Sequence, residues 1–227
     1  RRNSEGELVP ALAESWEIAP DGMTVTLKLR EGVKFQNGYD FTADDVVFTF
    51  ERTLAQPGSA LFADICSGAE KIDEYTVKLN LVYPEQAILQ YLTRANDIMS
   101  KQYFEEVGED GYAAAPIGTG PYKLVEWQKG SKLVLERYDD YYLGAAPIKN
   151  VEVRILKESS TLLMALETGD VDVIYTLTGL DIENVKSNPD LAYHETNGTT
   201  IWSIAFNTEK EPFNNAKVRQ ALAMAIN

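Results

Sequence analysis

The side chains that most often perform catalysis are scarce in this sequence of 227 residues. His194 is the only histidine and Cys66 the only cysteine, and Cys66 lies in no recognisable nucleophile motif. A Ser-His-Asp or Cys-His arrangement would have to use these single residues, and neither a CxxC motif nor a metal site with two histidines can form. The sequence therefore predicts neither a catalytic site nor a metal site.

Two pairs of adjacent carboxylates are the next candidates for chemistry. They are Asp44–Asp45 and Asp139–Asp140. Adjacent residues of one helix or strand point in different directions, so such a pair does not converge on one reacting atom. We interpret the first pair as part of a helix cap and the second as part of a solvated turn.

Two short motifs offer little support for a further function. Gly118-Thr119-Gly120 is followed directly by Pro121 and opens no helix, so it is neither a phosphate-binding loop nor a dinucleotide fingerprint. The triplet 197–199 (Asn-Gly-Thr) fits a glycosylation sequon, but this pattern is too short to carry a prediction by itself.

The charge balance argues against nucleic acid as a partner. The formal net charge is -14, from 35 acidic and 21 basic residues, and no cluster of lysine and arginine opposes it locally. Such a field repels phosphate backbones. We interpret the charge as a solubilising surface, with a preference for cationic ligands as the alternative. No stretch reaches the ~18 apolar residues that predict a membrane helix.

Periodicity predicts an α/β unit in the first half of the chain. Residues 24–30 and 75–81 alternate between apolar and polar, as half-buried strands do. Thr42 and Asp45 have the spacing of a capping box, which predicts a helix over residues 42–54. We expect its apolar residues Val47, Phe50 and Leu54 to pack on a sheet that contains strand 24–30, in one compact unit ending near residue 116.

The second half of the chain predicts further strands and helices. A hairpin is expected at 122–138, strands at 151–156, 171–175 and 199–206, and helices after 84, after Ser159 or Ser160, and at 181–187. Gly169 has the position of a helix C-terminal glycine. The expected fold class is mixed α/β.

The two ends of the sequence suggest a fragment of a longer chain. It begins at Arg1 without a methionine or a signal peptide, and it ends inside a helix capped by Asn214 or Asn215. We expect the apolar stripe of that helix, with Val218 and Leu222, to be exposed or covered by a neighbouring molecule.

Five segments, in order along the chain, together resemble one protein family. They are LVPALAESWEIAPDGMTVTLKLREGVKFQNG, TADDVVFTFERTL, PIGTGPYKLVEWQKGSKLVLERYDDYYLGAAP, ALETGDVDV and FNTEKEPFNNAKVRQALAMAIN. The family is that of the peptide/nickel-type solute-binding proteins of ABC importers (family 5). Gln36 departs from the pattern, because members commonly have histidine at that position, and no function is attached to it.

The resemblance implies a type II periplasmic-binding-protein-like fold of mixed α+β character, of which this chain holds lobe I only. Residues 1–116 resemble domain II, residues 117–205 the middle of domain I, and residues 206–227 the crossover and first helix of a truncated domain III. It also implies an extracytoplasmic location, in the periplasm or at the cell surface as a lipoprotein. Contact with the membrane would then occur only through a lipid anchor.

The implied function is capture of a peptide or similar small ligand in a cleft between lobes and delivery to the ABC permease, without a cofactor and without enzymatic activity. Tyr175 and Thr176 match positions that face the cleft, Trp202 is a second candidate, and Phe62 is a candidate from domain II. Core packing is the alternative role for each aromatic ring. An enzyme on a related scaffold and a surface interaction module stay open as other functions. The ligand could be a dipeptide, a longer peptide, a metal chelate or a sugar.

Overall fold

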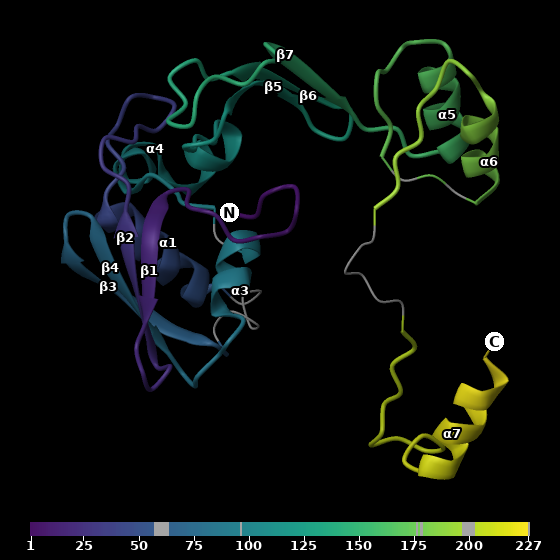
Figure 1. Ribbon diagram of the computed structural model, residues 1–227, viewed down its shortest axis with the longest axis horizontal. Helices are drawn as coiled ribbons and strands as arrows, with labels where there is room; N and C mark the ends of the chain where they lie inside the picture. Colours follow the sequence, from purple (N-terminus) through teal and green to yellow (C-terminus); the bar gives the residue numbers. More distant parts are fainter. Residues whose placement is uncertain (57–63, 96, 176, 178, 197–202, 227) are drawn as a thin grey trace. The chain divides into compact units, whose positions relative to one another are not determined.

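A computed structural model describes residues 1–56, 64–95, 97–175, 177, 179–196 and 203–226. The chain divides into two compact units, Arg1–Leu156 and Lys157–Asn227 (Figure 1). The expected boundaries near residues 116 and 205 refer to the domains of a larger protein and stay predictions. The compact unit that begins at Arg1 extends beyond residue 116, because it also contains a second sheet.

The first unit is built on a four-stranded antiparallel sheet with the strand order β1-β2-β4-β3. Its strands are β1 (Ala13–Ile18), β2 (Thr24–Leu29), β3 (Cys66–Asp73) and β4 (Thr76–Leu81). The predicted alternation in β2 is confirmed, because Val25, Leu27 and Leu29 are buried while Lys28 is exposed. The matching apolar residues of β4 are buried beside them, so one face of this sheet forms the core.

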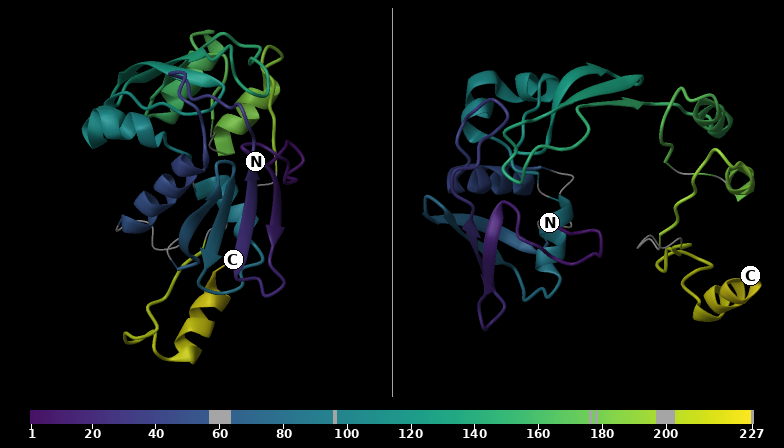
Figure 2. Two further views of the ribbon diagram at one scale, coloured as in Figure 1. Left: turned by 90° about the vertical axis from the view of Figure 1, so that its left-hand side faces the viewer. Right: turned by 45° about the horizontal axis from the view of Figure 1, so that its top comes forward.

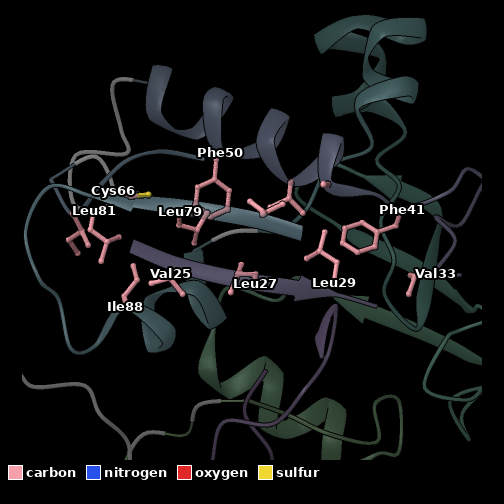
Figure 3. Close-up of a cluster of buried hydrophobic side chains, with 14 of the residues drawn as sticks. Val25, Leu27, Leu29, Val33, Phe41, Phe50, Cys66, Leu79, Leu81 and Ile88 are labelled. Carbon is pink, nitrogen blue, oxygen red and sulfur yellow. The ribbon is translucent and has the colours of Figure 1, made fainter. Parts of the chain in front are cut away.

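Helix α1 (Ala43–Ala55) covers that face of the sheet (Figure 2). The predicted capping box is present: the hydroxyl of Thr42 accepts from the backbone N–H of Asp44 at 3.3 Å, and Asp45 Oδ2 accepts from that of Thr42 at 2.9 Å. Phe50 is 2% exposed and points from the helix toward the strands (Figure 3). Val47 and Leu54 pack against the same core, as expected.

We expect Thr42→Ala to lower the free energy of unfolding of the first unit by about 0.5–2 kcal/mol, because the variant leaves a helix N–H group without its cap. Urea denaturation monitored by circular dichroism measures the change. Glu51→Ala, at an exposed position of the same helix, is the control and should change the free energy by less than about 0.5 kcal/mol. A Thr42 variant as stable as this control would contradict the proposed contribution of the cap.

Two further helices complete the first unit. Helix α3 (Ile88–Ala95) begins later than expected after residue 84, and helix α4 (Lys101–Ala114) was not predicted. Asp45 joins α1 to α4, because its Oδ1 accepts from the backbone N–H of Lys101 at 2.8 Å. Burial raises the pKa of the Asp45 carboxyl, although hydrogen bonds from backbone N–H groups oppose this shift.

The guanidinium of Arg52 strengthens the contact between α1 and α4. It lies 4.1 Å from the ring centre of Phe104, and its Nη2 lies 3.3 Å from Oε1 of Glu109. A cation over an aromatic face is attracted by the ring quadrupole, so this pair adds to the apolar packing between the two helices.

The first unit also contains a three-stranded antiparallel sheet with the order β5-β6-β7. Its strands are β5 (Tyr122–Gln128), β6 (Lys132–Arg137) and β7 (Asn150–Arg154). The hairpin between β5 and β6 is confirmed, with Gly130 at φ 78° in its turn. Strand β7 ends at Arg154, earlier than the expected residue 156.

The two faces of this smaller sheet differ in chemistry. The register places Leu124, Leu133, Leu135 and Val151 on one face, since opposed residues share a face and successive residues alternate. The other face carries short ion pairs, one of them between Lys132 Nζ and Glu126 Oε2 at 3.2 Å. The sheet is therefore amphipathic.

Cys66 lies at the start of β3 and is 1% exposed. Its thiol donates to the carbonyl oxygen of Asn80 at 3.4 Å, across the β3–β4 pair. Burial raises the pKa of this thiol, since the thiolate would lose its hydration. The cysteine therefore belongs to the packed core (Figure 3).

The second unit contains helices α5 (Ser159–Glu167), α6 (Gly179–Ser187) and α7 (Ala216–Ala225). Helix α5 begins without a side-chain cap at Glu158, so the expected capping by Ser159 or Ser160 is wrong. Gly169 ends this helix with φ 75°, as predicted, because this conformation is strained for residues with a Cβ.

Two expected strands of the second unit need correction. Residues 171–175 form no strand, although they alternate, because a strand needs a ladder partner and the described part of the chain provides none. Of the expected strand 199–206, residues 203–206 are not strand, and residues 199–202 lie outside the described ones.

Helix α7 agrees with its prediction. The side chain of Asn215 accepts from the backbone N–H of Lys217 at 2.9 Å and so caps the helix. Leu222 is 39% exposed, as expected, whereas Val218 is half-buried; no residue of this helix is fully buried. Among the described residues, no helix is long and apolar enough to cross a membrane.

Candidate ligand-binding site

Tyr175 is the one predicted ligand contact that the structure describes. Helix α5 ends in a tight turn, in which the backbone N–H groups of Asp170 and Val171 both donate to the carbonyl oxygen of Ala165, at 2.8 and 3.2 Å. The chain then runs to Tyr175, whose side chain is 92% exposed. An exposed phenol offers a ligand both a stacking face and a hydroxyl group. Tyr175 therefore packs into no core formed by the described residues.

The other three predicted contacts, Thr176, Trp202 and Phe62, lie outside the described residues. Their grouping with Tyr175 therefore stays a prediction. All four positions were suggested by the resemblance to a family and by no other sequence signal.

The first unit has an apolar cavity that sequence reasoning missed. Its volume is about 330 Å³, within the usual range for small-molecule pockets. Helices α1 and α3, strands β1 and β2, and the segment before β1 contribute its walls. The apolar lining includes Leu12, Trp16, Phe50, Leu89 and Leu92. No sequence signal could locate it, because its walls come from segments as far apart along the chain as Arg1 and Tyr142.

Tyr142 provides a polar group in the wall of this cavity. Burial raises the pKa of its hydroxyl, so the group stays protonated and neutral at physiological pH. The guanidinium of Arg30 lies 5.7 Å from the ring centre of Tyr142, on the side of the loop that follows β2. Arg30 also pairs with Glu14 at 3.0 Å, so its charge is largely satisfied.

A second hollow, of about 490 Å³, lies against the smaller sheet of the first unit. Leu124, Leu133 and Leu135 from the apolar face of the smaller sheet line it, together with residues 116–120. Both hollows have mainly apolar linings and could bury apolar groups of a ligand by noncovalent contact. Among the described residues, no group of three His, Cys, Asp or Glu side chains could hold a metal ion.

The comparison with known proteins identifies the family. The model for bacterial extracellular solute-binding proteins, family 5 (middle region), matches residues 7–227. The chain belongs to this family. The resemblance inferred from the sequence is thereby confirmed.

The chain is similar to curated proteins that are named for different ligands or transport roles. Heme-binding protein A of Haemophilus influenzae is 32% identical over 97% of this chain and 45% of its own length. The probable ABC transporter periplasmic-binding protein SapA of Escherichia coli is 34% identical, with the same coverage. The dipeptide-binding protein of Escherichia coli is 30% identical over 97% of this chain and 46% of its own length. The chain thus spans about half the length of these relatives.

Solved structures of related proteins confirm the expected fold. The periplasmic binding protein DppA of Helicobacter pylori, in complex with the peptide STSA, is 30% identical with a TM-score of 0.80, over 97% of this chain and 48% of that protein. The dipeptide-binding protein of a Pseudoalteromonas species, in complex with Met-Leu, is 27% identical with a TM-score of 0.82, over 98% and 49%. The fold is therefore that of type II periplasmic binding proteins, of which this chain represents about half.

Proposed function

We propose that this chain forms part of an extracytoplasmic solute-binding protein that captures a peptide or a similar small ligand and delivers it to the permease subunits of an ABC importer. The observation that carries this proposal is the family match over residues 7–227. The structural likeness to a DppA protein that holds a peptide supports it over 97% of the chain.

The proposed mechanism is closure of two lobes over the ligand. A ligand that lies where domains meet loses most of its contact with water, and hinge closure adds contacts that the open form lacks. A peptide can be held extended through hydrogen bonds to its main chain, which tolerates varied side chains. We assign residues 1–116 to domain II, 117–205 to the middle of domain I and 206–227 to the crossover into domain III.

We propose Tyr175, Thr176, Trp202 and Phe62 as the ligand contacts of this part of the protein. The exposure of Tyr175 supports its assignment, since a ring that packs against few neighbours is free to stack on a ligand. The protein would act in the periplasm, or as a lipoprotein at the cell surface, and noncovalent binding requires no cofactor.

We expect Trp202→Ala in the intact protein to weaken peptide binding by about 1–3 kcal/mol, and Tyr175→Ala to weaken it in the same direction, since aromatic anchors dominate binding energy in buried sites. Calorimetric titration with a panel of di- to pentapeptides measures the affinities. Tyr83→Ala is the matched control, because Tyr83 is an exposed tyrosine of the first unit and should leave affinity within about twofold.

Two outcomes would overturn parts of this proposal. Unchanged affinity in both aromatic variants would remove these residues from the site. If the intact protein bound no peptide but bound heme, a nickel–histidine chelate or a sugar acid in the same titration, the ligand class would be wrong while the binding function would stand.

A further inference from the structure

The segment that connects α4 to the three-stranded sheet forms hydrogen bonds with the side chain of Gln36. Gln36 lies in the loop between β2 and α1. This segment, residues 117–122, contains Gly118, Gly120 and Pro121, which would leave a free chain flexible at the glycines. Gln36 lies opposite it, in a turn in which the N–H of Gly38 donates to the carbonyl oxygen of Phe35 at 2.8 Å.

The side-chain amide and the backbone N–H of Gln36 both form hydrogen bonds with this segment. Its Nε2 donates to the carbonyl oxygens of Gly120 at 3.1 Å and of Tyr122 at 2.7 Å. Its Oε1 accepts from the backbone N–H of Gly118 at 3.3 Å, and its own backbone N–H donates to the carbonyl oxygen of Gly118 at 3.0 Å. The side chain therefore acts like a short added strand that satisfies three backbone groups.

Two tyrosines hold the ends of the same segment. The hydroxyl of Tyr112 in α4 donates to the carbonyl oxygen of Ile117 at 2.7 Å. After β6, the backbone N–H of Tyr138 donates to the carbonyl oxygen of Pro121 at 2.8 Å, and its hydroxyl donates to that of Phe35 at 3.3 Å. Both rings are buried. The segment is thus fixed from α4, from the smaller sheet and from the Gln36 turn at once.

We propose that Gln36 is a clasp that joins the four-stranded and three-stranded sheets into one rigid body, so that residues 117–122 are not a hinge. We define the clasp as Gln36 with its contacts to Gly118, Gly120 and Tyr122. Any closure that accompanies ligand capture must then use other connections of the chain. This inference goes beyond the proposed function, because it holds whatever the ligand is.

The geometry requires two donors and one acceptor at the end of this side chain, which only a primary amide of this length provides. Gln36→Leu removes all three hydrogen-bonding groups and leaves the backbone groups unpaired. Gln36→Glu replaces the NH2 group with a carboxylate oxygen. This oxygen can donate no hydrogen bond and is repelled by the carbonyl oxygens of Gly120 and Tyr122. In a half-buried site with such neighbours, the pKa of the introduced carboxyl should be raised.

The sign of the pH effect follows from that raised pKa. The folded protein would prefer the protonated carboxyl, which can donate to one carbonyl oxygen. The Glu variant should therefore recover part of the clasp below the ordinary pKa of glutamate and lose it as the pH rises through the raised value. The Leu variant has no titratable group and should show no such recovery.

Amide hydrogen exchange resolved by NMR tests the clasp in this chain. In Gln36→Leu, we expect the Gly118 amide to exchange at least about tenfold faster, while Val77 and Leu79 in β4 keep their protection. In Gln36→Glu, the same amide should be fast at pH 7 and slower, relative to its intrinsic rate, at pH 4. Gln102→Leu, which replaces an exposed glutamine of α4, is the matched control and should change neither region.

A distance measurement separates a clasp from a residue that only adds stability. Spin labels at Ile72 in β3 and at Ile148 before β7, both exposed, report the separation of the two sheets. The distance distribution should be narrow in the wild type and broader in Gln36→Leu. An unchanged distribution and an unchanged Gly118 rate would overturn the proposal. Equal acceleration of exchange across the whole unit would also overturn it, because that result shows global destabilisation alone.

Discussion

We expect this chain of 227 residues to bind a ligand of the intact protein at least ~100-fold more weakly than the intact protein does. The chain spans about 45% of the length of its relatives, and in the proposed mechanism it supplies one wall of the cleft. The missing wall then has to contribute only about 3 kcal/mol, at roughly 1.4 kcal/mol for each tenfold change in affinity. This is a modest demand for half of a buried site, since closure adds contacts only where a second lobe is present.

Calorimetric titration of the chain and of the intact protein with one shared ligand measures the ratio. Circular dichroism on the chain alone is the control that it folds. Equal affinities would show that the whole site lies within these 227 residues, and the account based on two lobes would then be wrong. That result would leave the clasp at Gln36 untouched, because the clasp does not depend on where the ligand binds.

We expect Phe50→Ala to lower the free energy of unfolding of the first unit by about 3–5 kcal/mol, as large-to-small changes at buried aromatic positions do. Phe50 is 2% exposed and lies between α1 and strands β2 and β4 (Figure 3). It also lines the cavity of about 330 Å³, so its removal would enlarge an existing void that the surrounding side chains do not fill.

Urea denaturation followed by tryptophan fluorescence measures this loss, because Trp16, one of three tryptophans, packs against the same core. Met224→Ala provides the control, since Met224 is an exposed residue of α7 and its replacement should cost less than about 0.5 kcal/mol. A Phe50 variant that loses less than about 1 kcal/mol would show that the void is filled by relaxation of its neighbours.

Elements whose signals are local were predictable from the sequence. Helix α1 carries its cap at Thr42 and Asp45 and its apolar stripe within 13 residues, so nothing distant is needed to specify it. The hairpin of β5 and β6 is equally local, because its turn at Gly130 places the two strands side by side. The arrangement of the fold beyond these elements was predicted only from the family resemblance.

Elements that depend on distant partners were not predictable. Residues 171–175 have the alternation of a strand, but alternation specifies a face and not a partner. Helix α4 escaped prediction because Gly108, at φ 72°, interrupts its periodicity with a kink.

The candidate site shows the same division. The exposure of Tyr175 agrees with a role at a surface, but its companions came only from the resemblance. The cavity and the clasp could not be predicted, since both depend on which segments meet in space. Gln36, for example, has its partners 82 to 86 residues away along the chain.

The burial of Cys66 has a consequence for experiments on this chain. A thiol that is inaccessible and protonated reacts with neither oxidants nor alkylating reagents until β3 separates from the core. The only sulfhydryl of the chain is thus shielded from mixed disulfides while the first unit is folded. The rate at which Cys66 is alkylated therefore reports the rate at which that unit opens, and no cysteine has to be introduced for the measurement.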